Sequence, residues 1–193
     1  MNKINCELLD NDITQGIRTE IFPELIRIMK LPNIYIFCNK RQILFYTNYF
    51  VNEMQYKFDL IIWHKTNIIP AFSHQYLNDV EYCLYFHAPG TCNPQNYDDA
   101  KTVVETTTNK IGKENYKHPT VKPLELIEKL IRNSSKPGDI VFDCFLGSGT
   151  TAVASKNQGR HYLGIEKNPI WYKVSCDRLD CIDANGQIGF LLK

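Results

Sequence analysis

Short apolar runs alternate with helix-like apolar spacing along this chain. Short, mostly apolar runs predict strands at 34–38, 59–63, 81–86, 140–143 and 161–165. Such runs are typical of strands that are buried on both faces of a parallel sheet. Apolar residues at helical spacing predict helices between these runs, at 19–31, 41–56, 124–131, 150–154 and 171–179. The alternation predicts an α/β fold with a mostly parallel sheet and helices on both of its faces.

The segment from Asp139 to Asn168 carries the clearest functional signal. A strand ends at Asp143, the chain turns through Gly147-Ser148-Gly149, a helix follows, and a second strand ends on Glu166. Glycine permits positive φ and lets a ligand approach the backbone, while the helix N-terminus offers unpaired N–H groups to an anionic group. Glu166 is placed to accept hydrogen bonds from two ribose hydroxyls. This βαβ arrangement predicts a nucleotide site at the carboxyl ends of the two strands.

Two other nucleotide sites do not fit the residues of this turn. A phosphate-binding P-loop requires a lysine after the last glycine, and Thr150 follows Gly149. A dinucleotide fold prefers a third glycine three residues after Gly149, where this chain has Ala152. The turn therefore favours a nucleoside ligand without a pyrophosphate.

The residues upstream of this segment narrow the interpretation. His118-Pro119-Thr120-Val121-Lys122-Pro123 precedes the helix at 124–131, and Asp143 to Thr151 and Gly164-Ile165-Glu166 follow. In order and spacing these motifs resemble the S-adenosylmethionine-dependent amino-methyltransferases of DNA, in the circularly permuted group whose cofactor half lies C-terminal to the catalytic half. The resemblance extends from about Thr19 to Leu179, although the family often has proline where this chain has Cys144.

The resemblance implies a Rossmann-like methyltransferase fold in one domain over 1–193. The remainder of the catalytic half would occupy 19–86, a short target-recognition-like region 87–117, and the cofactor-binding half 118–180. S-adenosylmethionine would be the cofactor, with the methionine end and its carboxylate near the upstream motif and the ribose on the acid. The implied cofactor-binding residues are His118, Thr120, Lys122, Asp143, Phe145, Gly147, Ser148, Gly149, Thr150 and Glu166.

Residues 87–117 are rich in Gly, Pro, Asn, Thr and charged residues, and a segment of this length is either an ordinary surface loop or a functional one. The family has its target-recognition region here. Acidic side chains lie among the basic ones, and a mixed charge run is often only a solvated face. Candidate contacts to double-stranded DNA are Lys65, Lys101, Lys110, Lys113 and Lys117.

The catalytic tetrapeptide of the family, D/N/S-P-P-Y/F/W, is absent from this chain, because no two of its nine prolines are adjacent. In the permuted order the tetrapeptide and its strand would precede the helix that begins near Thr19. We therefore expect the sheet to lack one central strand, and we assign no catalytic residue. Three interpretations stay open: a truncated gene product, one part of a split enzyme completed by a second polypeptide, or an inactive cofactor-binding remnant.

Composition limits the class of protein and the kinds of binding site that this chain can have. The 193 residues are 44% hydrophobic, enough for a folded domain, and no apolar run reaches the roughly 18 residues of a membrane span. Seven scattered cysteines without a CxxC pair argue for reduced thiols in a cytoplasm and against a zinc site. A net charge of +1 gives no general attraction to DNA, so DNA binding would need local basic clusters.

Two functional hypotheses follow. The first is a DNA methyltransferase that modifies the exocyclic amine of adenine (N6) or cytosine (N4), in an incomplete or split form and in the setting of restriction and modification. The second is a catalytically inactive protein or accessory subunit that binds S-adenosylmethionine or DNA. The absence of a Pro-Pro pair favours the second for the isolated chain, and the other motifs favour the first.

Overall fold

The computed structural model describes residues 16–69, 76–108, 120–180 and 189–192. The chain divides into two compact units. The first contains the residues up to Asn93 together with Lys101–Thr107, and the second contains Pro94–Ala100 and the residues from Thr108 onward. The chain therefore passes between the units at 93–94, 100–101 and 107–108. The single-domain organisation expected from the family stays a prediction.

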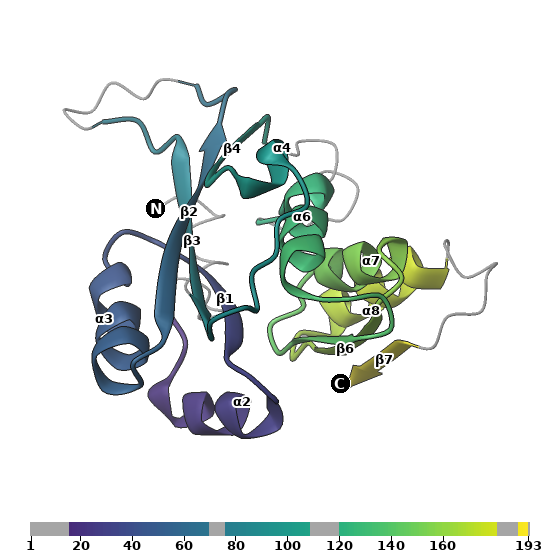
Figure 1. The fold of residues 1–193 in the computed structure, drawn as a ribbon. Coiled ribbons are helices and arrows are strands. Elements are labelled where there is room, and N and C mark those ends of the chain that lie inside the picture. Colours follow the sequence, from purple (N-terminus) through teal and green to yellow (C-terminus); the bar gives the residue numbers. More distant parts are fainter. Residues whose placement is uncertain (1–15, 70–75, 109–119, 181–188, 193) are drawn as a thin grey trace. The chain divides into compact units, whose positions relative to one another are not determined.

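The first unit is built on a four-stranded sheet in the order β1-β3-β2-β4 (Figure 1). Its strands are β1 (Asn33–Cys38), β2 (Lys57–Lys65), β3 (Val80–His87) and β4 (Val103–Thr106). β3 pairs antiparallel with both β1 and β2, whereas β4 pairs parallel with β2. No helix lies between β2 and β3 in the described part of the chain, and a direct return of this kind gives an antiparallel neighbour. The expectation of parallel strands is therefore wrong for β3.

Helices of the first unit cover the face of this sheet that carries Ile36, Leu84 and Phe86. They are the 3-10 turn η1 (Thr19–Ile21), α2 (Phe22–Ile28), α3 (Ile43–Thr47) and the π-helical segment η2 (Asn48–Glu53). The predicted helix over 41–56 is thus shorter and changes its hydrogen-bond pattern within its length. The aromatic side chains of these helices form part of the core, since rings from the helices pack with rings from the sheet: Phe22, Tyr46, Phe50 and Phe86.

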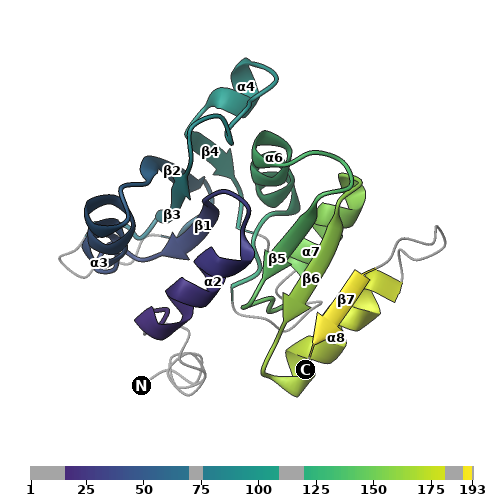
Figure 2. The same cartoon turned by 60° about the horizontal axis from the view of Figure 1, so that its bottom comes forward.

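The second unit has a three-stranded parallel sheet in the order β5-β6-β7, which Figure 2 shows side by side. β5 (Ile140–Asp143) and β6 (His161–Ile165) coincide with the predicted strands. β7 (Gly189–Leu192) was missed by sequence reasoning, because its apolar run is weak. Parallel neighbours require crossover connections, and helices between successive strands supply them.

Three helices of the second unit lie on one side of this sheet in Figure 1: α6 (Leu124–Ser134), α7 (Thr150–Asn157) and α8 (Pro169–Asp180). Asn168 caps α8, and its Oδ1 accepts the N–H of Ile170 at 2.9 Å. The buried core joins the helices to β6 through Leu146, Ala152, Val153, Tyr162 and Leu179. This core fixes where β5 ends and α7 begins.

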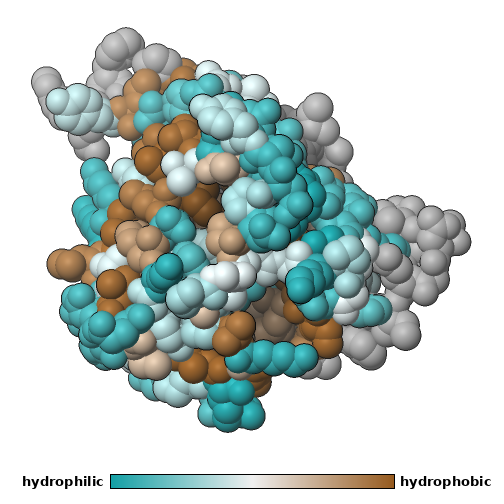
Figure 3. Space-filling model, in the orientation of Figure 1, coloured by the Kyte–Doolittle hydropathy of each residue, from teal (hydrophilic) through white to brown (hydrophobic). Residues whose placement is uncertain are grey.

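The described part of the region 87–117 contains two regular elements. They are α4 (Tyr97–Ala100), which belongs to the second unit, and β4, which belongs to the first. Residues 109–119 lie outside the described part of the chain. Figure 3 shows hydrophobic and hydrophilic residues interspersed on one face of the molecule. None of the helices in the described segments is long and apolar enough to cross a membrane.

Candidate functional site

The candidate site begins where β5 and β6 end together. Their register pairs Asp143 with Gly164, so the segment after β5 and the residue after β6 emerge at the same edge of the sheet. The N–H of Leu146 donates to the carbonyl of Ile165 at 3.0 Å, which ties the turn after β5 to the end of β6. The predicted glycine turn and the predicted acid are therefore held at one place.

The glycine turn has the backbone conformation that its sequence predicts. Gly147 has φ of 56° and Gly149 has φ of 81°, both in the left-handed region. Gly149 is the N-cap of α7, and its N–H donates to the carbonyl of Leu146 at 3.0 Å. In this position the first turn of α7 leaves N–H groups without intrahelical acceptors.

A second reason for glycine at position 149 comes only from the structure. A Cβ there would lie 3.0 Å from the Cβ of Ser175 and 3.1 Å from its Cα, both on α8. The space beside Gly149 is therefore filled by the protein's own helix. The sequence-based reason, close approach of a ligand, is replaced at this glycine by close approach of α8.

Glu166 is the most constrained charged group of the site. It is 7% exposed, and both of its oxygens accept backbone hydrogen bonds: Oε2 from Gly147 at 2.7 Å and Oε1 from Asn168 at 2.8 Å. An ionised carboxylate has about four acceptor positions, so two remain for other donors. The carboxylate is held against the glycine turn before any ligand arrives.

Asp143 fixes the other end of the turn. Its Oδ1 accepts the N–H of Phe145 at 2.9 Å, and its Oδ2 accepts the hydroxyl of Thr151 at 2.7 Å. These bonds connect the end of β5 to the first turn of α7. Phe145 follows directly and its side chain is 58% exposed, which leaves an aromatic surface at the edge of the turn.

Cys144 lies beside these residues as a neutral thiol. Burial, reinforced by the nearby Asp143 carboxylate, raises the pKa of Cys144 to about 12. A thiol with such a pKa stays protonated near neutral pH and is a poor nucleophile. Cys144 occupies the position at which the amino-methyltransferases that this chain resembles often have proline.

Two side chains of α8 contact the glycine turn, and sequence reasoning missed both of them. The Ser175 hydroxyl donates to the carbonyl of Gly147 at 2.7 Å, and the Arg178 guanidinium donates to the carbonyl of Ser148 at 2.5 Å. Their separation of three residues puts both on one helix face, but such spacing occurs in many helices and does not point to a site.

The upstream motif is only partly described. Thr120 and Lys122 are half-buried, and the Lys122 ammonium donates to the carbonyl of Thr120 at 3.4 Å. His118 lies outside the described residues. The predicted role of these three residues at the methionine end of the cofactor stays a prediction.

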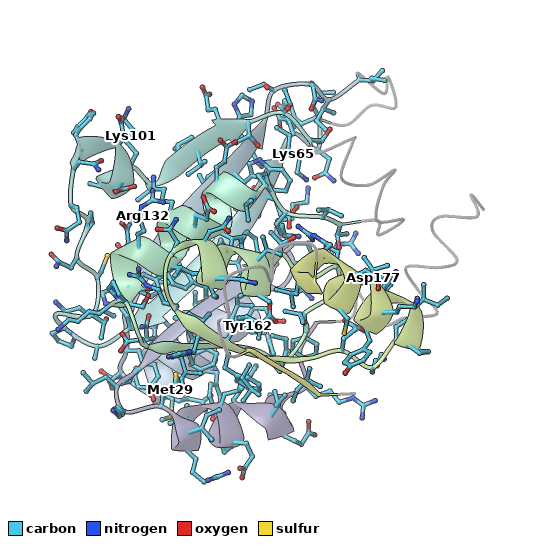
Figure 4. The ribbon with its side chains drawn as sticks, turned by 90° about the vertical axis from the view of Figure 1, so that its right-hand side faces the viewer. Met29, Lys65, Lys101, Arg132, Tyr162 and Asp177 are labelled. Carbon is cyan, nitrogen blue, oxygen red and sulfur yellow. The ribbon has the colours of Figure 1, made fainter. Side chains whose placement is uncertain are left out.

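The lysines predicted to contact DNA differ in their surroundings. Lys65 forms an ion pair with Glu81 at 3.1 Å, lies over the ring of Trp63 and has a side chain only 16% exposed. Lys101 is exposed on the segment that follows α4 (Figure 4). The other three, Lys110, Lys113 and Lys117, lie outside the described residues.

Part of the predicted recognition region is anchored to the second unit. Asp99 of α4 is 8% exposed, and its carboxylate pairs with Arg132 of α6 at 2.9 Å (Figure 4). The buried side chain of Asn133 donates to the Asp99 carbonyl at 2.8 Å. The segment at 94–100 is therefore a docked element of the second unit. The described residues contain no group of three or more His, Cys, Asp or Glu that could hold a metal ion.

Comparisons with known proteins agree with this arrangement. Residues 19–175 match the family model N6_N4_Mtase, described as DNA methylase. Over 133 residues the chain is 32% identical to the type II methyltransferase M2.DpnII of Streptococcus pneumoniae, a match that covers 62% of this chain and 50% of that protein. The chain thus spans about half the length of that relative.

Solved structures show the same fold. The crystal structure of the M1.HpyAVI–SAM complex aligns with a TM-score of 0.70 and 30% identity, over 86% of this chain and 84% of that one. The cytosine-N4-specific PvuII DNA methyltransferase aligns with a TM-score of 0.63 and 18% identity, over 78% of this chain and 60% of that one. The second likeness shows the fold alone, and together they confirm the predicted Rossmann-like methyltransferase fold.

Proposed function

Because the chain belongs to the N6_N4_Mtase family of DNA methylases, we propose that its second unit is the S-adenosylmethionine-binding half of a DNA amino-methyltransferase. One observation carries this proposal: the 2.7 Å hydrogen bond from the Gly147 N–H to the Glu166 carboxylate. It joins a glycine turn after one parallel strand to an acid after the next, which is the arrangement that binds nucleosides in open α/β sheets. The SAM complex of M1.HpyAVI, which shares the fold, supports the same cofactor.

Each part of the turn has a proposed role. The two remaining acceptor positions of Glu166 receive the ribose hydroxyls, and the exposed ring of Phe145 packs against the adenine. Gly147, Ser148 and Thr150 line the pocket with backbone groups. Gly149 and Asp143 hold the turn in its conformation. His118, Thr120 and Lys122 hold the methionine end, with the lysine near its carboxylate.

The reaction we propose is transfer of the sulfonium methyl group to the exocyclic amine of adenine (N6) or cytosine (N4) in duplex DNA. The amine nitrogen forms the new N–C bond, the S–C bond breaks, its electron pair stays on sulfur, and one amine proton is lost. The sulfonium is already activated, so the protein's task is to bring donor and acceptor into line. The target base must leave the helical stack to reach the methyl group.

We propose that this reaction requires a tetrapeptide that residues 1–193 do not supply. No two prolines are adjacent in the chain, so the D/N/S-P-P-Y/F/W sequence is absent. The described strands also form two separate sheets, and β1 and β5 each stand at an end of their sheet. A second polypeptide that carries the tetrapeptide and one further strand fits both observations. The position of the glycine turn after the first sheet supports the circularly permuted order.

Contacts to DNA are proposed for Lys65, Lys101, Lys110, Lys113 and Lys117. The ion pair between Lys65 and Glu81 partly neutralises the first of these, so its phosphate contact would require the pair to separate. Lys101 is the more accessible of the two described lysines. Removing one phosphate contact should weaken binding to all duplex sequences. It should also reduce the steepness of the plot of log K against log salt concentration by about one unit.

An alternative function is cofactor binding without methyl transfer, and the missing tetrapeptide favours it for the isolated chain. Two measurements separate the alternatives. Calorimetric titration with S-adenosylhomocysteine tests the cofactor site, and tritiated methyl transfer to duplex DNA, with and without the polypeptide encoded upstream, tests the reaction. We expect binding by the chain alone and methyl transfer only by the mixture. Absence of binding by the folded chain would overturn the cofactor proposal, and transfer by the chain alone would overturn the split form.

A further inference from the structure

The glycine turn is held from behind by one face of α8. Residues 171, 175 and 178 are separated by four and three positions, which puts them on the same side of a helix. The Ser175 hydroxyl is 0% exposed and lies 2.7 Å from the Gly147 carbonyl and 3.0 Å from the Trp171 carbonyl. Because a hydroxyl has one proton, the shorter bond to Gly147 is the one that fixes the turn.

Arg178 makes the second set of contacts. One guanidinium nitrogen, Nη1, lies 2.5 Å from the Ser148 carbonyl, 3.2 Å from the Ser148 hydroxyl and 3.2 Å from the Thr150 hydroxyl. Ser148 and Thr150 are 4% and 6% exposed, so these bonds form away from bulk solvent. Hydrogen bonds from a charged donor are about twice as strong as neutral ones in such surroundings.

Arg178 lies in the last turn of α8, where the helix dipole favours a cation. Its guanidinium also reaches the start of α7 at Thr150, and the N-terminus of that helix favours anions over cations. Its hydrogen bonds to the turn give the guanidinium its specific role there, and they also make the start of α7 more positive.

These bonds act on two consecutive peptide groups of the glycine turn. The carbonyl of Gly147 and the N–H of Ser148 belong to one peptide unit, as do the carbonyl of Ser148 and the N–H of Gly149. A donor on the carbonyl side orients the unit and polarises its N–H, since hydrogen bonds in series strengthen one another. The position of the turn's N–H groups thus depends on α8.

From these contacts we infer that Ser175 and Arg178 are positioning residues for the cofactor turn, and that α8 sets the affinity of the site without touching the ligand. The inference rests on the proposed function, because it concerns the same cofactor. It adds α8 to the elements that shape the site, because Gly149 packs directly on Ser175. A change in α8 should therefore reach the cofactor.

The test compares variants of α8 in the full chain. Arg178→Ala removes the guanidinium donor to Ser148 and Thr150, Arg178→Lys keeps the charge but loses the planar guanidinium group, and Ser175→Ala removes the donor to Gly147. Lys173→Ala is the matched control, since it removes one positive charge from an exposed position of the same helix. Asp177→Ala, also exposed and labelled in Figure 4, controls for substitution in α8 generally. Circular dichroism gives the folded fraction of each variant before titration.

Affinity for S-adenosylhomocysteine is measured by calorimetry on the folded fraction, with hydrogen exchange at the amides of residues 147–150. We expect a loss of about tenfold or more for Arg178→Ala and a smaller loss for Arg178→Lys and Ser175→Ala, on the scale of one charge-assisted hydrogen bond. Exchange at 147–150 should rise in the same order, and both controls should bind within twofold of the unmodified chain.

Each outcome has a distinct meaning. Failure of the unmodified, folded chain to bind contradicts the proposed function, not the role of α8 alone. Binding by the unmodified chain together with equal affinities in Arg178→Ala and Lys173→Ala overturns the positioning role. If Arg178→Ala does not fold, Arg178→Lys and Ser175→Ala decide the question, since unchanged affinity and exchange in both would also overturn it.

Discussion

Replacing Glu166 with alanine perturbs a carboxylate that serves the fold and, as proposed, the ligand. The substitution leaves the N–H groups of Gly147 and Asn168 without their acceptors at 2.7 and 2.8 Å. A hydrogen bond to a charged group contributes about 1.5–3 kcal/mol, so the two together contribute about 3–6 kcal/mol. Since domains are stable by about 5–15 kcal/mol, we expect a large fall in the free energy of unfolding. Urea denaturation measures it.

Glu166→Gln is a smaller change that separates the structural role of Glu166 from its proposed role in ligand binding. It keeps the shape and one acceptor oxygen, but its NH₂ group meets an N–H donor, so we expect about half of the stability loss of the alanine variant. The ligand role is tested by a cycle that combines this variant with an S-adenosylhomocysteine analogue lacking both ribose hydroxyls. If Glu166 holds the ribose, the unmodified chain should prefer the natural ligand by about tenfold or more, and the variant should lose most of that preference.

The control is Glu125→Ala, which removes an exposed carboxylate from the first turn of α6. It should leave both stability and ligand preference nearly unchanged. An equal preference for the ribose hydroxyls in the unmodified chain and in Glu166→Gln would refute the ribose role and leave Glu166 as a purely structural acceptor. Unchanged stability in Glu166→Ala would refute the structural role.

Three further perturbations have expected outcomes. Gly149→Ala should lower the free energy of unfolding by about 2–4 kcal/mol, because alanine disfavours the positive φ and its Cβ overpacks against α8. Gly138 has a φ of 84° and open space around it, so Gly138→Ala should lower that free energy by only about 1–2 kcal/mol. Equal urea midpoints for the two variants would contradict this difference. Asp99→Ala leaves Arg132 unpaired and should lower the free energy of unfolding by about 1.5–3 kcal/mol. Hydrogen exchange in α4 should become faster, and unchanged exchange would refute the docking of α4. The pKa of Cys144 is raised from an ordinary 9.0 to about 12. The protonated thiol therefore contributes its full stability below pH 9, and this contribution is lost as the pH rises toward 12. Urea denaturation should show that Cys144→Ala loses less stability than the unmodified chain between about pH 8 and 10.5.

Local sequence was sufficient to predict most of the strands. The runs at 34–38, 59–63, 81–86, 140–143 and 161–165 are all strands in the structure. A long apolar run between turn residues restricts the backbone strongly, because few other conformations bury it. Element boundaries were less certain: β2 extends beyond its predicted run at both ends, and the helix predicted over 41–56 divides into α3 and η2.

Strand direction, by contrast, followed from connections that periodicity does not report. β3 is apolar and buried like a parallel strand, yet it runs antiparallel to β1 and β2. The chain returns to it from β2 without a helix among the described residues, so it enters the sheet in the opposite direction. The short β4 and the weak run of β7 were missed for a related reason, since pairing with β2 and β6 makes them strands.

The sequence by itself determined the glycine turn and the acid after the next strand, because each depends on residue type at fixed short spacing. Tertiary structure decided what surrounds them. Glu166 meets the Gly147 N–H across 19 positions, and Ser175 and Arg178 meet the turn across 28 and 30. The same holds for Gly149, whose missing side chain makes room for α8. Contacts between residues so far apart depend on how the sheet and helices pack, and no local pattern records that packing.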